Sequence, residues 1–286
     1  MRTSSDQLFR HVERLASLQP SRNYLNLASL NEARDNIASE LASYGYTPEM
    51  QSWQAGGNTY YNVIARYNAG RERTLVVGAH YDVAGDQPGA DDNASAVAGL
   101  LETARLLQSV RPELDYTVEL VAYSLEEPPF FATEQMGSFV HARSLHEQQA
   151  TVLGMVCYEM IGYFTDEPGT QQFPSEAMKD QYGTRGDFIA VVSRPGSDDF
   201  ARKVYLLMKE AGTVRTELAI LPGDDGLSGL SDQRNYWHFG YQALMINDTS
   251  FLRNPNYHMP TDTPDTLDYE RMAGVVEASF RAISNL

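Results

Sequence analysis

Two neighbouring stretches decide the fold: VVGAHYD at residues 76–82 and GADDNAS at residues 89–95. The apolar run that ends before His80 predicts a buried strand, and the apolar periodicity after the second stretch predicts a helix. Open α/β sheets bind ligands at such strand ends. His80 offers an imidazole and Asp91 a carboxylate, two ligand types that zinc accepts. Asp82, two residues beyond His80, faces the same side of an extended chain and is placed to hold the second ring nitrogen.

A simpler interpretation is open at this point. His80 at a strand end can serve only as a hydrogen-bonding group, and Asp91 or Asn93 can serve as the N-cap of the following helix. From these two stretches alone the metal site and the N-cap are equally good interpretations, so residues elsewhere in the chain have to decide between them.

Strands and helices are predicted to alternate along nearly the whole chain, which favours an α/β fold. Strands are expected at residues 62–67, 75–77, 116–124, 152–158, 188–192, 217–221 and 243–246. Helices are expected at residues 5–19, 30–44, after 91, and at 133–149, 197–212, 231–239 and 268–286. The order predicts one three-layer α/β/α domain over residues 1–286, with a central mixed, mostly parallel sheet and N-terminal helices (1–55) packed on it. Two segments, 164–186 and 222–236, are too long for simple connections and are predicted to be loops near the site.

Composition excludes some classes of partner. The net charge of −16 would be repelled by nucleic acid and by anionic membrane surfaces. A single cysteine, Cys157, excludes an intrachain disulfide, and its apolar neighbours predict a buried, unreactive thiol. No segment approaches the length of a membrane helix, and the first ten residues lack the apolar core of a signal peptide. The sequence as it stands predicts a cytoplasmic protein, or a periplasmic or secreted one if a signal peptide has been removed.

Acidic and histidine residues close the predicted strands or follow them: His80, Asp91, Glu126-Glu127, Glu159 and His258. Two metals that share a bridging carboxylate and a bridging water need about this set, because each takes one histidine and one terminal carboxylate. A remaining carboxylate then acts as general base on that water. Glu126 and Glu127 suit this division, because adjacent residues at a strand end can point one into the metal shell and the other at the water.

Five stretches in this order resemble the co-catalytic zinc exopeptidases, a family that includes bacterial leucyl aminopeptidases and, more distantly, glutaminyl cyclases. They are GAHYD (78–82), PGADDNAS (88–95), SLEE (124–127), EMIGY (159–163) and the segment from His258 through TPDT (263–266). The likeness covers roughly residues 60–285. Any one stretch is a weak signal, whereas all five in sequence are specific.

The resemblance implies a role for each of these residues. The metal ligands would be His80 and Glu159 on one zinc, Glu127 and His258 on the other, and Asp91 as the bridge between them. Glu126 would be the general base, and Asp82 would hold His80 from outside the metal shell. The resemblance also implies a cis peptide bond after the bridging aspartate, here Asp91–Asp92.

The chain departs from the family pattern at three places. Position 159 is more usually aspartate, and the longer glutamate requires the strand or the metal to shift. The insertion PPFFATEQ (128–135) follows Glu127 in place of a glycine and a short turn, and it predicts an apolar wall beside the site or, alternatively, a rigid loop with ordinary packing. Gln233 stands where many relatives have a histidine.

Aromatic residues near the predicted site have two open interpretations. Those at positions 163–164, 236–237 and 251 belong either to the core or to a substrate pocket. Arg253 is either a ligand for a substrate carboxylate or one half of a surface ion pair.

We therefore predict a metal-dependent exopeptidase that removes N-terminal residues from peptides, with two zinc ions (cobalt or manganese as substitutes) and a metal-bridging water activated by Glu126. One alternative is a zinc enzyme like the glutaminyl-peptide cyclotransferases, which typically work with one zinc. The other is a catalytically inactive binding protein on the same fold. The expected partner is a peptide or a small aminoacyl substrate, not nucleic acid or a membrane.

Overall fold

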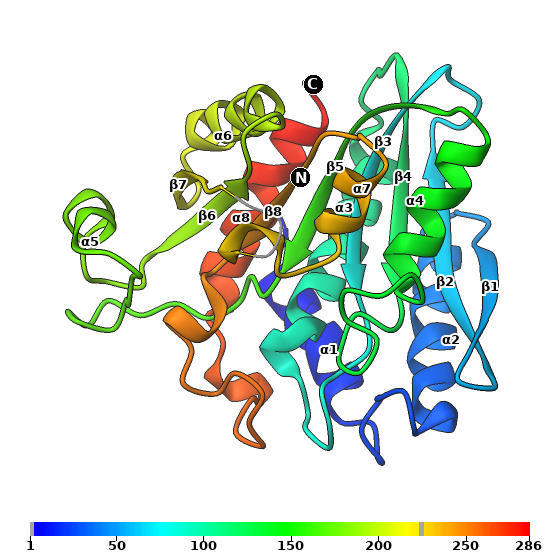
Figure 1. Cartoon of the computed structure of the whole chain (residues 1–286), viewed down its shortest axis with the longest axis horizontal. Helices are drawn as coiled ribbons and strands as arrows, with labels where there is room; N and C mark the ends of the chain where they lie inside the picture. Colours follow the sequence, from blue (N-terminus) through cyan, green and yellow to red (C-terminus); the bar gives the residue numbers. More distant parts are fainter. Residues whose placement is uncertain (1–2, 223–225) are drawn as a thin grey trace.

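A mixed sheet of eight strands runs through the computed structural model, which describes residues 3–222 and 226–286 (Figure 1). The strands are β1 (Glu49–Ala55), β2 (Asn58–Tyr67), β3 (Arg73–His80), β4 (Tyr116–Tyr123), β5 (Thr151–Glu159), β6 (Phe188–Ser193), β7 (Arg215–Ile220) and β8 (Ala243–Asn247). Their spatial order is β1-β2-β4-β3-β5-β8-β6-β7. β3 pairs in parallel with both β4 and β5, β5 with β8, and β6 with β7, while the other three pairings are antiparallel.

Helices cover both faces of this sheet. They are α1 (Ser5–Ala16), α2 (Leu27–Ser43), α3 (Ala96–Val110), α4 (Gly137–Glu147), α5 (Glu176–Tyr182), α6 (Asp198–Ala211), α7 (Gln233–His238) and α8 (Tyr269–Ile283). Short helical turns are η1 (Ala90–Ser95), η2 (Leu227–Gly229), η3 (Ser250–Leu252) and η4 (Pro264–Thr266). No helix among the described residues combines the length and the apolar character needed to cross a membrane.

Two apolar clusters fill the space between the layers. Val77 and Val156 point into the cluster beneath α1, α2, α3, α6 and α8, whereas their neighbours Val76 and Cys157 point into the cluster beneath α4 and α7. This alternation follows from the two-residue period of a strand, and the near-continuous apolar runs in β3, β4 and β5 reflect burial on both faces. The predicted three-layer fold with a mixed sheet is confirmed.

All seven predicted strands are present, but three other features differ from the sequence prediction. Residues 49–55, expected in a helical region, form the edge strand β1, which turns into β2 through Gly56 and Gly57 at φ 56° and 82°. The helix predicted from residue 133 begins at Gly137, because the insertion before it forms turns. The predicted loop 164–186 contains α5, and 222–236 contains η2, while residues 223–225 lie outside the described part.

The N-terminal segment reaches the predicted site through Arg22, which is almost fully buried. Its guanidinium donates to the carbonyl oxygens of Tyr81, Leu15, Pro88 and Gly89 at 2.5–3.1 Å. Burial lowers the pKa of Arg22 to about 10, so the group is still a cation at neutral pH. Arg22 therefore holds the connection between β3 and η1, the two elements that carry the central motifs.

Candidate metal centre

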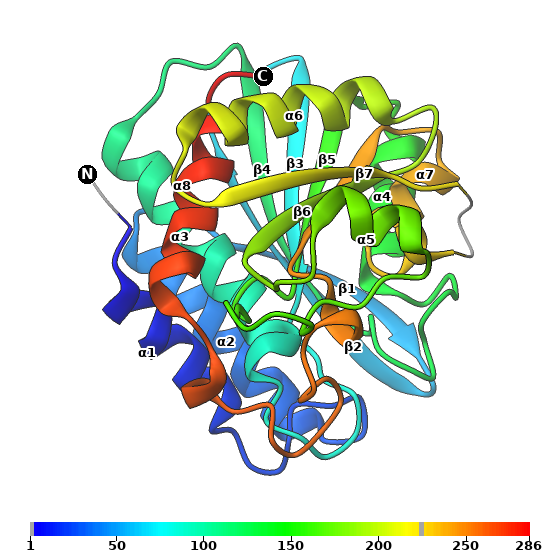
Figure 2. The same cartoon turned by 90° about the vertical axis from the view of Figure 1, so that its left-hand side faces the viewer.

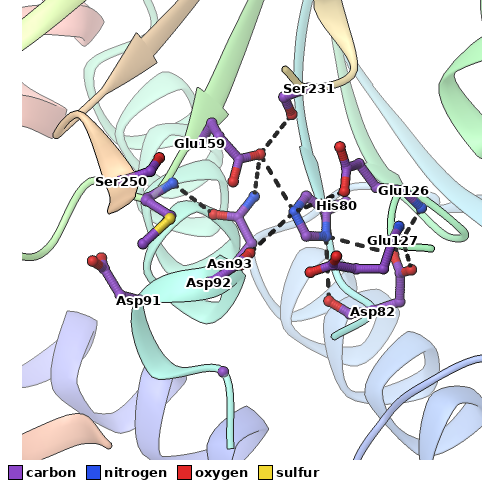
Figure 3. A network of polar contacts seen from close by, with 12 residues as sticks. His80, Asp82, Asp91, Asp92, Asn93, Glu126, Glu127, Glu159, Ser231 and Ser250 are labelled. Atoms are coloured by element: carbon purple, nitrogen blue, oxygen red, sulfur yellow. Dashed lines mark hydrogen bonds and ion pairs between the residues drawn. The ribbon is translucent and has the colours of Figure 1, made fainter. Parts of the chain in front are cut away.

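The ends of three parallel strands bring the predicted residues together. His80 is the last residue of β3 and Glu159 the last of β5, while Glu126 and Glu127 follow the end of β4. Because β3 pairs in parallel with both neighbours, these ends meet at one edge of the sheet, where all four side chains are buried (Figure 3).

Asp92, not Asp91, stands between the two histidines. Asp92 Oδ1 lies 3.4 Å from His80 Nε2, and Asp92 Oδ2 lies 3.0 Å from His258 Nε2. One carboxylate thus faces both imidazoles, which is the arrangement expected of a bridging ligand. The cis peptide bond likewise falls at Asp92–Asn93, not at Asp91–Asp92. Both sequence predictions for this motif are one residue too early.

The carboxylate of Asp91 is directed away from the cluster (Figure 3). Its Oδ1 accepts a hydrogen bond from the backbone N–H of Gly162 at 3.0 Å, and its Oδ2 accepts from Asn254 Nδ2 at 2.7 Å. Asp91 therefore ties the motif to two neighbouring loops. The backbone N–H groups of Asp91 and Asp92 both donate to the carboxylate of Asp262, which fixes the direction in which each side chain leaves the turn.

Two groups of possible metal ligands share Asp92. The first consists of His80, Asp92 and Glu159, and the second of Asp92, Glu127 and His258; within each group the ligand atoms lie within 4.8 Å of one another. His80 Nε2 is 3.3 Å from Glu159 Oε2, and His258 Nε2 is 3.5 Å from Glu127 Oε2. Apart from the exchange of Asp91 for Asp92, this is the division of ligands that the resemblance implied.

A third group, formed by His80, Glu126 and Glu127, also has its ligand atoms within 4.8 Å of one another. In it Glu126 Oε2 lies 3.8 Å from His80 Nε2, farther than Asp92 or Glu159. Glu126 is therefore either a metal ligand or a general base beside the metals. Its longer distance to His80 favours the general base.

The histidines and carboxylates shift one another's proton affinities. Although burial opposes the charged form, Glu159 and Glu126 raise the pKa of His80 well above its ordinary value. Burial also opposes the charge on His258, but hydrogen bonds to Asp92 and Glu127 raise its pKa to about 10.

The carboxylates divide into two kinds. Burial disfavours the charge on Asp92, yet its contacts with His258 and His80 hold its pKa below the ordinary range. Burial raises the pKa of Glu126 well above its ordinary value and that of Glu127 to about 7. Neighbouring carboxyl groups with raised pKa values are typical of catalytic sites.

The donor set suits a metal ion on independent grounds. Asp92 Oδ1 and Glu127 Oε1 are buried and have no hydrogen-bond partner. Buried carboxylates without partners are costly unless a cation is close, and several of them surround only two histidines here. Oxygen and imidazole donors in this number are those that zinc prefers.

Asp82 occupies the position beneath these ligands. Its carboxylate oxygens accept hydrogen bonds from the backbone N–H groups of Glu126 and Glu127 at 3.2 and 3.1 Å. The backbone carbonyl of Asp82 lies 3.2 Å from His80 Nδ1, closer than its carboxylate at 3.5 Å. Asp82 thus positions both the histidine and the glutamate pair, although the partner of the imidazole is the carbonyl as much as the predicted carboxylate.

Several residues of the site carried little signal in the sequence. Ser231 Oγ donates to Glu159 Oε2 at 2.5 Å, and Asn93 Nδ2 donates to the same oxygen at 3.3 Å. Asp232 is fully buried with both oxygens unpaired, and burial raises its pKa to about 7 against the opposing charge of His80. In the stretch SDQ (231–233) only Gln233 drew attention, because the burial of Ser231 and Asp232 is a feature of the fold that the sequence does not show.

A cavity of about 1110 Å³, including its open mouth, extends from the cluster along β6, β7 and β8. Among the described residues that line it, the ionisable side chains near neutral pH are those of the cluster: Asp92, Glu126, Glu127, Glu159 and His258. The rest of the lining is mainly apolar and includes Phe188, Val192, Ala219 and Met245 from the strands. The inserted segment contributes Pro128 and Phe131, in agreement with the predicted apolar wall.

The aromatic residues with two interpretations divide between cavity and core. Phe251 and Tyr257 line the cavity, and Tyr257 stacks on the ring of His258 with a centroid separation of 3.9 Å. Tyr236 and Trp237 lie in the apolar cluster beneath α7. Arg253 is buried, which excludes a surface ion pair, and it is not among the described residues that line the cavity.

Comparison with known proteins identifies relatives along most of the chain. The sequence profile of Peptidase family M28 matches residues 62–283. YfbL, an uncharacterized protein of Escherichia coli (strain K12), is 40% identical over 290 residues, which covers 99% of this chain and 88% of that protein. Leucine aminopeptidase 1 of Leptosphaeria maculans is 24% identical over 74% of this chain but only 52% of its own length, so the chain spans about half of that fungal relative.

Solved structures share the fold at low identity. The LapA aminopeptidase of Legionella pneumophila matches 99% of this chain and 71% of its own, with a TM-score of 0.76 and 20% identity. The Bacteroides thetaiotaomicron glutaminyl cyclase bound to N-acetylhistamine matches 100% of this chain and 99% of its own, with a TM-score of 0.72 and 19% identity. At these identities the likeness establishes a common architecture and leaves the reaction to be argued from the site.

Proposed function

The chain belongs to peptidase family M28, and from that premise we propose that it is a zinc-dependent aminopeptidase that hydrolyses N-terminal residues from peptides. The observation that carries the proposal is the position of Asp92, whose two oxygens face His80 and His258 at 3.4 and 3.0 Å. A single carboxylate shared by two complete ligand groups suits a pair of metal ions.

Each side chain of the cluster has a part in this proposal. His80, Glu159 and Asp92 would hold one zinc ion, and His258, Glu127 and Asp92 the other. The two ions, when bound, would polarise the scissile carbonyl and lower the pKa of the attacking water.

Glu126 is proposed as the general base. It is buried beside both ligand groups, and burial raises the pKa of its carboxyl group, which makes its carboxylate a stronger base. Its carboxylate takes a proton from the water as the oxygen bonds to the carbonyl carbon. It then gives that proton to the amine that leaves when the C–N bond breaks. Asp82, through the N–H groups of Glu126 and Glu127, fixes the backbone from which both glutamates project.

The cavity supports recognition of an N-terminal residue. Its acidic end attracts a free amino group, and its apolar remainder has no charged side chain among the described residues with which to hold a charged substituent. A large apolar N-terminal side chain therefore suits the cavity, with its amine toward the carboxylates.

The second candidate is cyclisation of an N-terminal glutamine, since glutaminyl cyclases share this fold. The two complete ligand groups favour hydrolysis, because the cyclase alternative is expected to need one zinc. The cavity lining also favours hydrolysis, because an apolar chamber leaves the amide of a glutamine side chain with few partners.

A peptide assay separates these functions. The zinc-loaded protein is incubated with three peptides that differ only at the N-terminus: free phenylalanine, Nα-acetylated phenylalanine and free glutamine. Mass spectrometry of the products is expected to detect release of phenylalanine from the first peptide alone, and a chelator is expected to stop it. Cyclisation of the glutamine peptide with loss of ammonia would support the cyclase, and an absence of products from all three would support a binding protein.

A further inference from the structure

The segment from Gln171 to Gly186, here named the α5 wall, closes one side of the cavity. Phe173, Met178 and Tyr182 line the cavity from this segment, next to Phe188 of β6. The rings of Phe173 and Tyr182 stack at 5.7 Å, and those of Tyr182 and Phe188 at 6.3 Å. Figure 1 shows α5 projecting from the body of the molecule, and Figure 2 shows it beside β6.

The α5 wall has little packing of its own. Within α5 only Tyr182 is buried, while the side chains of Phe173 and Met178 are partly exposed. Tyr182, the last residue of α5, is held by two hydrogen bonds. Its hydroxyl donates to Leu218 O at 2.7 Å, and its backbone carbonyl accepts from the guanidinium of Arg215. A short helix with so few buried residues depends on the contacts at its two ends for its position.

Arg253 contacts the α5 wall at Gln171 and Gly186. At the Gln171 end, Gln172 N–H also donates to Leu252 O at 2.7 Å and Thr249 Oγ1 donates to Gln171 Oε1 at 3.1 Å. Arg253 Nε donates to Gln171 Oε1 at 2.8 Å, and Gln171 is itself buried. The arginine side chain also fills the space against Gly186, where an added Cβ would lie 2.7 Å from Arg253 Cδ. One side chain therefore contacts both the first and the last residue of the α5 wall.

The other contacts of Arg253 fix it to the sheet. Its Nη1 donates to Tyr163 O at 3.3 Å, and its guanidinium lies over the ring of Phe188 at 4.6 Å. Arg253 is only 5% exposed, and it is not among the described residues that line the cavity. A guanidinium suits this position because its planar group can stack on a ring and donate along its edge at the same time.

We propose that Arg253, acting through Gln171, is a positioning residue that holds the α5 wall against β6 and so sets the affinity for large apolar N-terminal side chains. The inference rests on the proposed aminopeptidase function, and it names the side-chain class that the cavity selects. A benzyl side chain has the area to pack against Phe173, Met178 and Tyr182. A methyl group on the same peptide buries little of that surface.

The test compares substrates that differ only in the size of the N-terminal side chain. For Arg253→Met we expect KM for a phenylalanyl arylamide to rise about tenfold more than KM for the alanyl arylamide, the size expected for altered apolar pocket contacts. Gln171→Leu removes the same bond from the other side and is expected to give a shift of similar size. Arg202→Met on α6, an exposed arginine 3.9 Å from Asp198, is the matched control.

A double-mutant cycle distinguishes this role from general damage. If the two residues act through one contact, the double variant Arg253→Met/Gln171→Leu is expected to shift the KM ratio no more than either single variant. Arg253→Lys, which keeps the charge and one donor, is expected to restore part of the wild-type ratio. Equal rises in both KM values, or additive shifts in the double variant, would overturn the proposal.

A binding measurement separates this inference from the proposed function. Calorimetric titration with L-phenylalaninol and L-alaninol measures selection by side-chain size without any turnover. The wild-type protein is expected to bind phenylalaninol more tightly, and the variants of Arg253 and Gln171 are expected to lose that preference. This result in a protein that hydrolyses no peptide would refute the aminopeptidase and leave the role of Arg253 standing. The same affinity of the wild-type protein for both amines, or an undiminished preference in the variants, would refute the role of Arg253.

Discussion

Glu126→Gln replaces one buried carboxylate oxygen with an amide nitrogen and leaves the side-chain volume almost unchanged. Glu127→Gln makes the same change one residue later. The two glutamates share a backbone held by Asp82, yet they differ in what their side chains meet. Glu127 belongs to the ligand group of Asp92 and His258, whereas Glu126 Oε2 is 3.8 Å from His80 and farther than the other carboxylates there.

The expected magnitudes follow from these positions. A general base in this position contributes on the order of 10²–10⁴-fold to kcat, or about 3–5 kcal/mol of transition-state stabilisation. Asp232 is another buried carboxyl group near His80, and both of its oxygens lack a hydrogen-bond partner, but it does not line the cavity in which the substrate would bind. We therefore expect Glu126→Gln to lower kcat by about 10³-fold with metal content unchanged, and Glu127→Gln to lower metal content.

The assay measures kcat with a phenylalanyl arylamide and metal content by mass spectrometry on the same preparations. Glu126→Gln with full metal and residual activity above a tenth of wild type would refute the assignment of the base. Loss of a metal from Glu126→Gln would instead identify Glu126 as a ligand, as in the grouping with His80 and Glu127.

Three further predictions concern residues around the site. Asp92→Asn is expected to reduce metal binding at both sites, whereas Asp91→Asn is expected to keep both metals. Metal titrations of the two variants test this, and an equal loss of metal from both would contradict the assignment of Asp92, in place of Asp91, as the bridging ligand. Although burial disfavours its charge, contacts with His141 and Arg66 lower the pKa of Glu119 from 4.5 to about 2. Glu119 therefore contributes up to about 3 kcal/mol above its unfolded pKa, and this contribution is lost as the pH falls from 4.5 toward 2. Urea unfolding of Glu119→Gln and wild type should differ most at pH 6–7 and converge only as the pH approaches 2, and a constant difference would refute this reasoning. Arg22→Met leaves buried carbonyls without a donor and should lower the unfolding free energy by about 3 kcal/mol, while unchanged urea midpoints would show that the buried guanidinium is dispensable.

The fold was predictable because the strands are apolar on both faces and are punctuated by clear turns. The runs at β3, β4 and β5 carry the signal of buried parallel strands, and the helices between them keep a 3.6-residue period. β1 was missed because an edge strand in which exposed residues alternate with partly buried ones resembles any amphipathic segment. α5 was missed because seven residues with one buried side chain show no periodicity.

The site was predictable where a residue's position at a strand end decides its direction. His80 and Glu159 end adjacent parallel strands, so their meeting follows from the topology alone. The choice between Asp91 and Asp92 does not follow, because both residues occupy one turn and the hydrogen bonds to Asp262, Gly162 and Asn254 decide which carboxylate turns inward. These partners lie 71–171 residues away in sequence, beyond any local pattern.

The most direct test of the two-metal account is the number of zinc ions bound per chain. The protein is stripped with a chelator, loaded with zinc, separated from free metal and analysed by mass spectrometry. Two zinc ions per chain are expected, because two complete ligand groups share Asp92. One zinc ion per chain, with the same content in Asp92→Asn, would contradict this expectation.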